Sequence, residues 1–70
     1  MSMNFGNRLN ELLKEKNISQ AVLANHIGFS QRAVSKWINH QSEPTESAIV
    51  RCAKYFSVST DFILGLTDDY

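Results

Sequence analysis

Five hydrogen-bonding side chains between residues 31 and 39 have the types and the spacing that could recognise a nucleic acid. Successive residues of a helix are about 100° apart, which places all five within an arc of about 140°: Gln31, Arg32, Ser35, Lys36 and Asn39. Two of them are cationic and none is acidic. Val34, Trp37 and Ile38 fall on the opposite arc. The segment is therefore predicted to be a helix with one apolar and one polar side.

The polar side matches the chemistry of base pairs. Arginine and lysine donate to guanine O6 and N7, and glutamine pairs with adenine N6 and N7. Gln31 and Arg32 stand at the N-terminal end of the segment, the end of a recognition helix that contacts base edges. Lys36 and Asn39, further along, are placed to reach outer bases or the DNA backbone. A polar face that contacts only solvent is the alternative, and the preceding residues argue against it.

The preceding residues predict a second short helix joined to this one by a tight bend. Ser19 is suited to cap a helix over residues 20–27, Gly28 to end it, and Ser30 to cap the helix that follows. Two short helices with a glycine at the bend are typical of a helix-turn-helix. The free amides at the start of the first helix, at residues 20–22, can hold a backbone phosphate.

Helical periodicity continues through the rest of the chain. We predict five helices, over residues 5–16, 20–27, 31–39, 46–56 and 60–64, with Thr45 and Ser59 as further N-caps and Pro44 in a loop. No segment alternates convincingly enough to be a strand. Residues 1–70 are expected to form one compact all-α bundle. Trp37 shares the phase of Val34 and Ile38 and is expected in its core.

Charge and cysteine content exclude several functional classes. The net charge of zero divides into five Lys and Arg against two Glu in residues 1–40, and two against five acidic residues in 41–70. The first half is therefore the candidate binding half. No apolar run is long enough for a signal peptide or a membrane span. A single cysteine, Cys52, forms no internal disulfide and fits a cytoplasmic protein. Its place on an apolar stripe predicts a buried thiol.

Neither a metal site nor catalysis is expected. His26 and His40 with Cys52 do not have the spacing of a zinc site, and no cofactor or small-molecule substrate is indicated. His26 or His40, a serine and Asp61 could be drawn as a hydrolytic triad, but no nucleophile elbow or oxyanion glycines accompany them. His26 is expected either as a surface residue or as a secondary phosphate contact. We do not expect an enzyme.

A resemblance to a known family covers roughly residues 5–66. It rests on Ser19-Gln20, Leu23-Ala24, residues 27–31, Val34-Ser35, Trp37, Asn39 and Pro44, and residues 56–59 and 62–65. The chain resembles the lambda-repressor/Cro (XRE-like) helix-turn-helix domains. The resemblance implies base contacts from Gln31, Arg32, Ser35 and Lys36, and DNA-backbone contacts from Gln20, Ser30 and Asn39. It also implies that Gln20 braces Gln31.

The sequence departs from that family in three places. His40 stands where a glycine is usual, and we expect it to keep the positive φ of the turn. Residues 41–43 offer no cation, which leaves phosphate contacts from this loop in doubt. Ala21 and Val22 replace the usual acidic residues, so that Val22 is expected to be exposed.

A single recognition helix reads too few base pairs to select one genomic site. The resemblance implies a homodimer on a two-fold operator, with half-sites about 34 Å apart. Apolar residues near the C-terminal end are candidates for the dimer interface: Phe56, Val58, Leu64 and Leu66, with Tyr70 as an addition. The chain is expected to be a sequence-specific DNA-binding transcriptional regulator, and specifically a repressor.

Two other classes stay open. One is a protein-interaction module such as the antitoxin of a toxin-antitoxin pair. The other is a nucleoid-type DNA binder that has no sequence preference.

Overall fold

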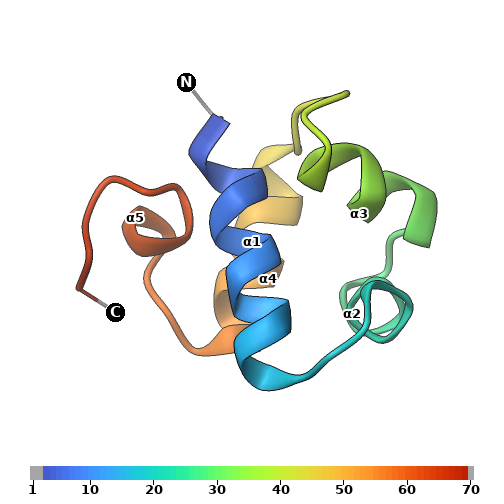
Figure 1. Ribbon diagram of the computed structural model, residues 1–70, viewed down its shortest axis with the longest axis horizontal. Helices are drawn as coiled ribbons and strands as arrows, with labels where there is room; N and C mark the ends of the chain where they lie inside the picture. The colour runs from blue at the N-terminus through green and yellow to red at the C-terminus, as the bar shows by residue number, and fades with distance from the viewer. Residues whose placement is uncertain (1–2, 70) are drawn as a thin grey trace.

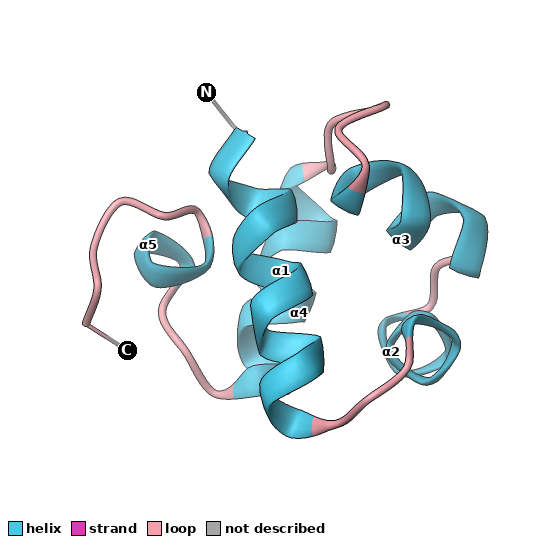
Figure 2. Cartoon of the chain, in the orientation of Figure 1, coloured by secondary structure: helices cyan, strands magenta, loops and turns pink. Residues whose placement is uncertain are grey.

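The computed structural model describes residues 3–69, and all regular structure in that range is helical (Figures 1 and 2). The helices are α1 (Met3–Lys16), α2 (Gln20–Ile27), α3 (Gln31–Ile38), α4 (Glu46–Phe56) and α5 (Thr60–Ile63). The prediction of an all-α bundle of five helices is confirmed. The bounds of α2 and α4 coincide with the expected ranges. α1 starts two residues earlier than expected, while α3 and α5 end one residue earlier, because Asn39 and Leu64 are their C-caps.

Hydroxyl side chains begin four of the helices. In each, the side-chain oxygen accepts a hydrogen bond from the amide three residues further on, at 3.0 to 3.1 Å: Ser19 from Val22, Ser30 from Ala33, Thr45 from Ala48 and Ser59 from Phe62. Each cap contributes about 0.5–2 kcal/mol. These caps fix the start of both helices of the helix-turn-helix.

Residues in the left-handed backbone conformation follow the C-terminal ends of α2 and α3. Gly28 has φ of 79° and His40 has φ of 60°. After each of them the next amide bonds back across the last turn: Phe29 N to Ala24 O at 3.0 Å, and Gln41 N to Lys36 O at 2.8 Å. This is the Schellman pattern. The positive φ expected at His40 is confirmed, because the turn needs it whether or not the residue is a glycine.

The core joins all five helices. α1 and α4 cross the middle of the view in Figure 1, with α2 and α3 on one side and α5 on the other. Phe5, Leu9 and Val34 are fully buried, and Trp37 is 5% exposed. The Trp37 ring meets Phe5 and Phe29 edge to face, with centroids 6.0 and 5.3 Å apart. Trp37 is thus a core residue, as predicted, and its packing anchors α3 against α1.

α1 and α3 approach each other closely at Gly6. A Cβ atom placed there would lie far inside van der Waals contact with the Trp37 carbonyl oxygen, and 3.2 Å from the Ile38 Cα. Both neighbours are backbone atoms, which cannot rotate away. The absence of a side chain at residue 6 therefore allows the close approach of α1 to α3.

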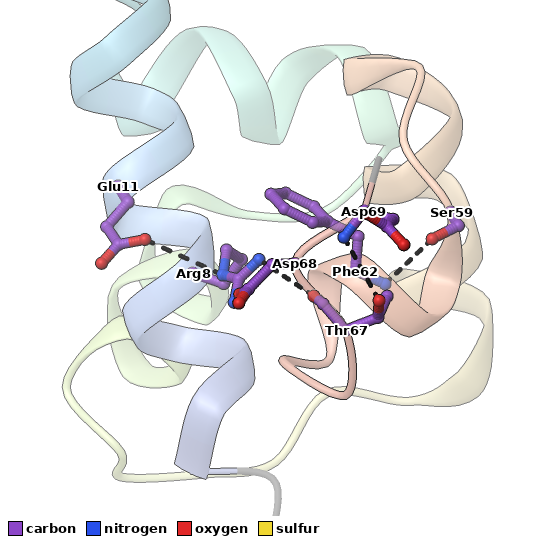
Figure 3. A network of polar contacts seen from close by, with 7 residues as sticks. All are labelled: Arg8, Glu11, Ser59, Phe62, Thr67, Asp68 and Asp69. Carbon is purple, nitrogen blue, oxygen red and sulfur yellow. Dashed lines mark hydrogen bonds and ion pairs between the residues drawn. The ribbon is translucent and has the colours of Figure 1, made fainter.

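A polar cluster ties the C-terminal segment to α1 (Figure 3). The Arg8 guanidinium lies 4.1 Å from the Phe62 ring centroid, donates to the Thr67 carbonyl oxygen at 3.5 Å and meets the Asp68 carboxylate at 3.5 Å. Its Nε lies 3.8 Å from the Glu11 carboxylate. One of the five cations of residues 1–40 is therefore directed at the acidic end of the chain rather than at a partner.

Cys52 is fully buried, as predicted, and burial raises the pKa of its thiol from 9.0 to about 12. We expect the folded protein to react slowly with a thiol reagent at pH 8, and the protein in denaturant to react at once. The unfolded chain releases the thiol proton near pH 9, while the folded chain keeps it, so this group lowers the free energy of unfolding as pH rises above about 9. Rapid reaction of the native thiol would contradict this burial.

No helix within residues 3–69 is long and apolar enough to cross a membrane.

Candidate nucleic-acid interface

The polar side of α3 lies on the surface, as its phase predicted. Gln31, Arg32 and Asn39 are exposed, while Ser35 and Lys36 are half-buried. The Asn39 side-chain amide lies 3.4 Å from the Ser35 hydroxyl, one turn earlier. The burial of Val34 and Trp37 on the opposite side holds this face outward. The structure thus brings the five residues together on one side of one helix.

Gln41 joins this face, which the sequence did not predict. A hollow of about 450 Å³ is lined by residues of α3 and the loop after it: Gln31, Arg32, Ser35, Lys36 and Gln41. Gln41 is placed there by the hydrogen bond that its backbone N–H donates to the Lys36 carbonyl oxygen, which follows from the left-handed turn at His40. Its side-chain amide can donate to a phosphate or a base edge. The expectation of positive φ at His40 was the signal that could have located it.

The backbone amides of residues 20–22, at the start of α2, were predicted to hold a phosphate. One of the three is not free. The Val22 amide already donates to the Ser19 hydroxyl at 3.1 Å. The amides of Gln20 and Ala21 are therefore the ones that remain for a phosphate. Val22 itself is 45% exposed, as expected.

A cation lines the same hollow as the first residue of α2. Lys14, at the end of α1, lines a hollow of about 420 Å³ together with Asn17 and Gln20. Lys14 was counted in the basic half but not expected at this position. Together with the amides of α2, its ammonium group makes a second place suited to a backbone phosphate.

Of two residues expected to contact the DNA backbone, Ser30 has a local hydrogen-bond partner, while Gln20 lacks the expected bond to Gln31. The Ser30 oxygen accepts from the Ala33 amide, which leaves the hydroxyl proton for a phosphate oxygen. Within residues 3–69 no hydrogen bond joins the side chains of Gln20 and Gln31. The brace between them stays a prediction for the DNA-bound protein.

The residues suggested for a dimer interface differ widely in exposure. Phe56 is 7% exposed and belongs to the core, so it offers almost no surface to a second chain. Val58 and Leu64 are half-buried against the core, and Leu66 is 72% exposed. Tyr70 lies outside the described residues. Among the candidates that the structure describes, the exposed apolar surface is therefore that of Leu66 and of the accessible parts of Val58 and Leu64.

The two histidines have different local partners. His40 Nε2 lies 3.2 Å from the Asn7 side-chain oxygen, and the exposed His26 ring packs 5.1 Å from the Tyr55 ring. Asp61, on α5, has no hydrogen bond to either histidine. In the part of the chain that the structure describes, no three His, Cys, Asp or Glu side chains are close enough to hold a metal ion.

Comparison with protein families matches residues 9–63 to the helix-turn-helix family model. Two curated proteins are similar in sequence. The HTH-type transcriptional activator BcrR of Enterococcus faecalis is 34% identical over 63 residues, which are 90% of this chain and 31% of that protein. The uncharacterized HTH-type transcriptional regulator YobD of Bacillus subtilis (strain 168) is 34% identical over 62 residues, 89% of this chain and 55% of that protein. The chain thus spans about a third and about half of their lengths.

Two solved structures of the P22 c2 repressor are similar in fold. The crystal structure of that repressor in complex with a synthetic operator matches with a TM-score of 0.79 and 29% identity, over 84% of this chain and 89% of that one. The solution structure of its DNA-binding domain matches with a TM-score of 0.82 and 28% identity, over 91% of this chain and 84% of that one.

Proposed function

This chain belongs to the helix-turn-helix family, in its lambda-repressor/Cro (XRE-like) branch, and we propose that it binds DNA sequence-specifically with α3 in the major groove. The observation that carries this proposal is the outward face of α3, on which five hydrogen-bonding side chains lie together without an acidic residue. A carboxylate there would repel phosphates and most base-edge acceptors. Residues 1–70 are proposed to act as one DNA-binding domain in the cytoplasm.

The proposed roles follow the position of each side chain. Gln31 and Arg32, at the N-terminal end of α3, read base edges, with Ser35 and Lys36 one turn further along. Phosphates are held at the start of α2 and at the ends of α3, by Gln20, Ser30 and Asn39. Lys14 is added to this backbone set because it lines a hollow together with Gln20. Gln41 is added because it lines a hollow with the four base-reading residues of α3.

We further propose that two copies occupy a two-fold operator and repress transcription by covering it. Four or five base-reading residues select only a few base pairs, so a second half-site is needed for specificity in a genome. Leu66, with the edges of Val58 and Leu64, is the surface proposed for the second copy. A relative named as an activator and another solved as a repressor leave activation as the alternative outcome, which a reporter gene behind the operator would distinguish.

Selection of bound sites from a random duplex pool tests the function directly. We expect an enriched motif with two halves related by a two-fold axis and centred about 34 Å apart. Sedimentation with the selected duplex, at tens of micromolar protein, should give two chains per duplex. One chain per duplex would contradict the homodimer. A pool without enrichment would favour the nucleoid-type binder, and weak DNA binding with an unrelated protein co-purifying at fixed stoichiometry would favour the antitoxin.

A further inference from the structure

A third hollow lies between the C-terminal end of α2 and α4, and no residue of α3 lines it. Its volume is about 510 Å³, and its lining includes His26 and Ile27 of α2 and Arg51, Lys54 and Tyr55 of α4. The volume is within the range of small-molecule sites, about 300–1,000 Å³. None of the five base-reading and backbone-contacting residues of α3 takes part in it.

Two cations on α4 face this hollow without a carboxylate partner. Arg51 and Lys54 are one turn apart and exposed. Both ion pairs within residues 3–69 belong to Arg8, so neither Arg51 nor Lys54 is neutralised. Glu46 shares an adjoining hollow with them but forms no ion pair with either. The lining of the main hollow contains no acidic residue.

Arg51 is held in place by the end of α2. Its Nη1 donates to the Ile27 carbonyl oxygen at 2.9 Å, and its guanidinium lies 5.9 Å from the Phe29 ring centroid. This bond satisfies a carbonyl at the helix end, which would otherwise repel an anion. A guanidinium has five N–H donors. One of them is used here, so a fixed cation with donors to spare borders the hollow.

A pair of rings forms the apolar wall. The His26 and Tyr55 ring centroids lie 5.1 Å apart with 34° between their planes, and the buried Ile27 also lines the hollow. A flat ring of a ligand could stack on such a wall while its charged group meets the cations.

We propose that this hollow binds a small organic anion, a carboxylate or phosphate carried on a flat ring. The proposal stands on the contacts between α2 and α4 and does not depend on DNA binding. A mononucleotide represents this chemistry, because it combines a phosphate with an aromatic ring.

Titration of the ¹⁵N-labelled protein with adenosine 5′-monophosphate tests the site. We expect amide shifts concentrated at Gly28, Arg51 and Tyr55, with a Kd below about 1 mM. Lys54→Glu should weaken binding by about tenfold, because it reverses one of the two charges. Lys16→Glu makes the same charge change at an exposed position outside the hollow, and it should leave the Kd within about twofold.

Three control measurements separate the rival explanations. Adenosine, which lacks the anion, and inorganic phosphate, which lacks the ring, should both bind more weakly than the nucleotide, and equal binding of either one would overturn the proposal. If Lys16→Glu weakened nucleotide binding as much as Lys54→Glu does, the nucleotide would be attracted by the overall charge of the protein rather than bound at this hollow. If Lys54→Glu weakened binding to duplex DNA more than Lys16→Glu does, the hollow would be part of the DNA-backbone contact, and the small-ligand site would be wrong.

Discussion

Replacing Arg32 by alanine should weaken binding to the selected operator by about 1–3 kcal/mol, a loss of roughly 5- to 150-fold, and should relax the preference at one base pair. Arg32 is exposed on the first turn of α3, where side chains reach base edges. An arginine that donates two hydrogen bonds to one base discriminates among bases. Only guanine offers two neighbouring acceptors, O6 and N7, in the major groove. The same change should cost less on random duplexes, where the guanidinium contributes only its charge.

Affinity for operator and random duplexes at one fixed salt concentration measures this difference, since salt alone changes the affinity of DNA-binding proteins. Gln20→Ala is the matched comparison, because a phosphate contact should weaken all duplexes by a similar factor. Lys16→Ala removes an exposed cation that has no proposed DNA contact. If Arg32→Ala and Gln20→Ala gave the same ratio of operator to random affinity, the assignment of base reading to Arg32 would be wrong.

Replacing Gly6 by alanine should destabilise the protein by at least about 2 kcal/mol, although the same change within a helix normally stabilises by about 1 kcal/mol. The reversal of sign comes from the contact between α1 and α3. The new methyl group would meet the Trp37 carbonyl oxygen and the Ile38 Cα, both of them backbone atoms. The helices would have to separate, and the packing of Phe5 on Trp37 would be lost with them.

Chemical denaturation followed by circular dichroism measures this effect. The denaturant concentration at the midpoint should fall, while the dependence of the unfolding free energy on denaturant concentration should stay similar. Glu15→Ala is the control, since it gains helix propensity at an exposed position of the same helix and should change stability by less than about 0.5 kcal/mol. A Gly6→Ala protein as stable as the parent would show that α1 and α3 are not in the close contact described. If Gly6→Ala displaced α3 without unfolding the protein, the change would appear as a loss of operator binding.

The helices themselves were accessible from local sequence. The spacing of Phe5, Leu9 and Leu12 and the capping hydroxyls of Ser19 and Ser30 act within a turn or two of the chain, which is why the observed bounds differ from the predicted ones by at most two residues. The buried side of α3 followed from the same periodicity. The polar residues of α3 were therefore expected on its outward side.

Contacts between distant residues were not accessible in this way. Arg8 was counted among the cations of the binding half, but it folds onto Phe62 and Asp68, about sixty residues away. Phe56 was proposed for an interface, although the packing of α4 places it in the core. Arg51, in the acidic half, bonds to the carbonyl that ends α2, 24 residues earlier.

The sequence by itself thus determined which residues form helices and which side of each helix is apolar, because periodicity and capping depend on neighbours along the chain. The sequence also showed that the neutral total charge is the sum of a basic half, residues 1–40, and an acidic half, residues 41–70. Only the tertiary structure decided which cations are free to meet a partner, because that depends on which carboxylates, rings and carbonyls the folding of the chain brings to each of them. Arg32, Lys36 and Lys14 remain free beside α2 and α3, Arg8 is taken up by the C-terminal segment, and Arg51 and Lys54 gather at a separate hollow.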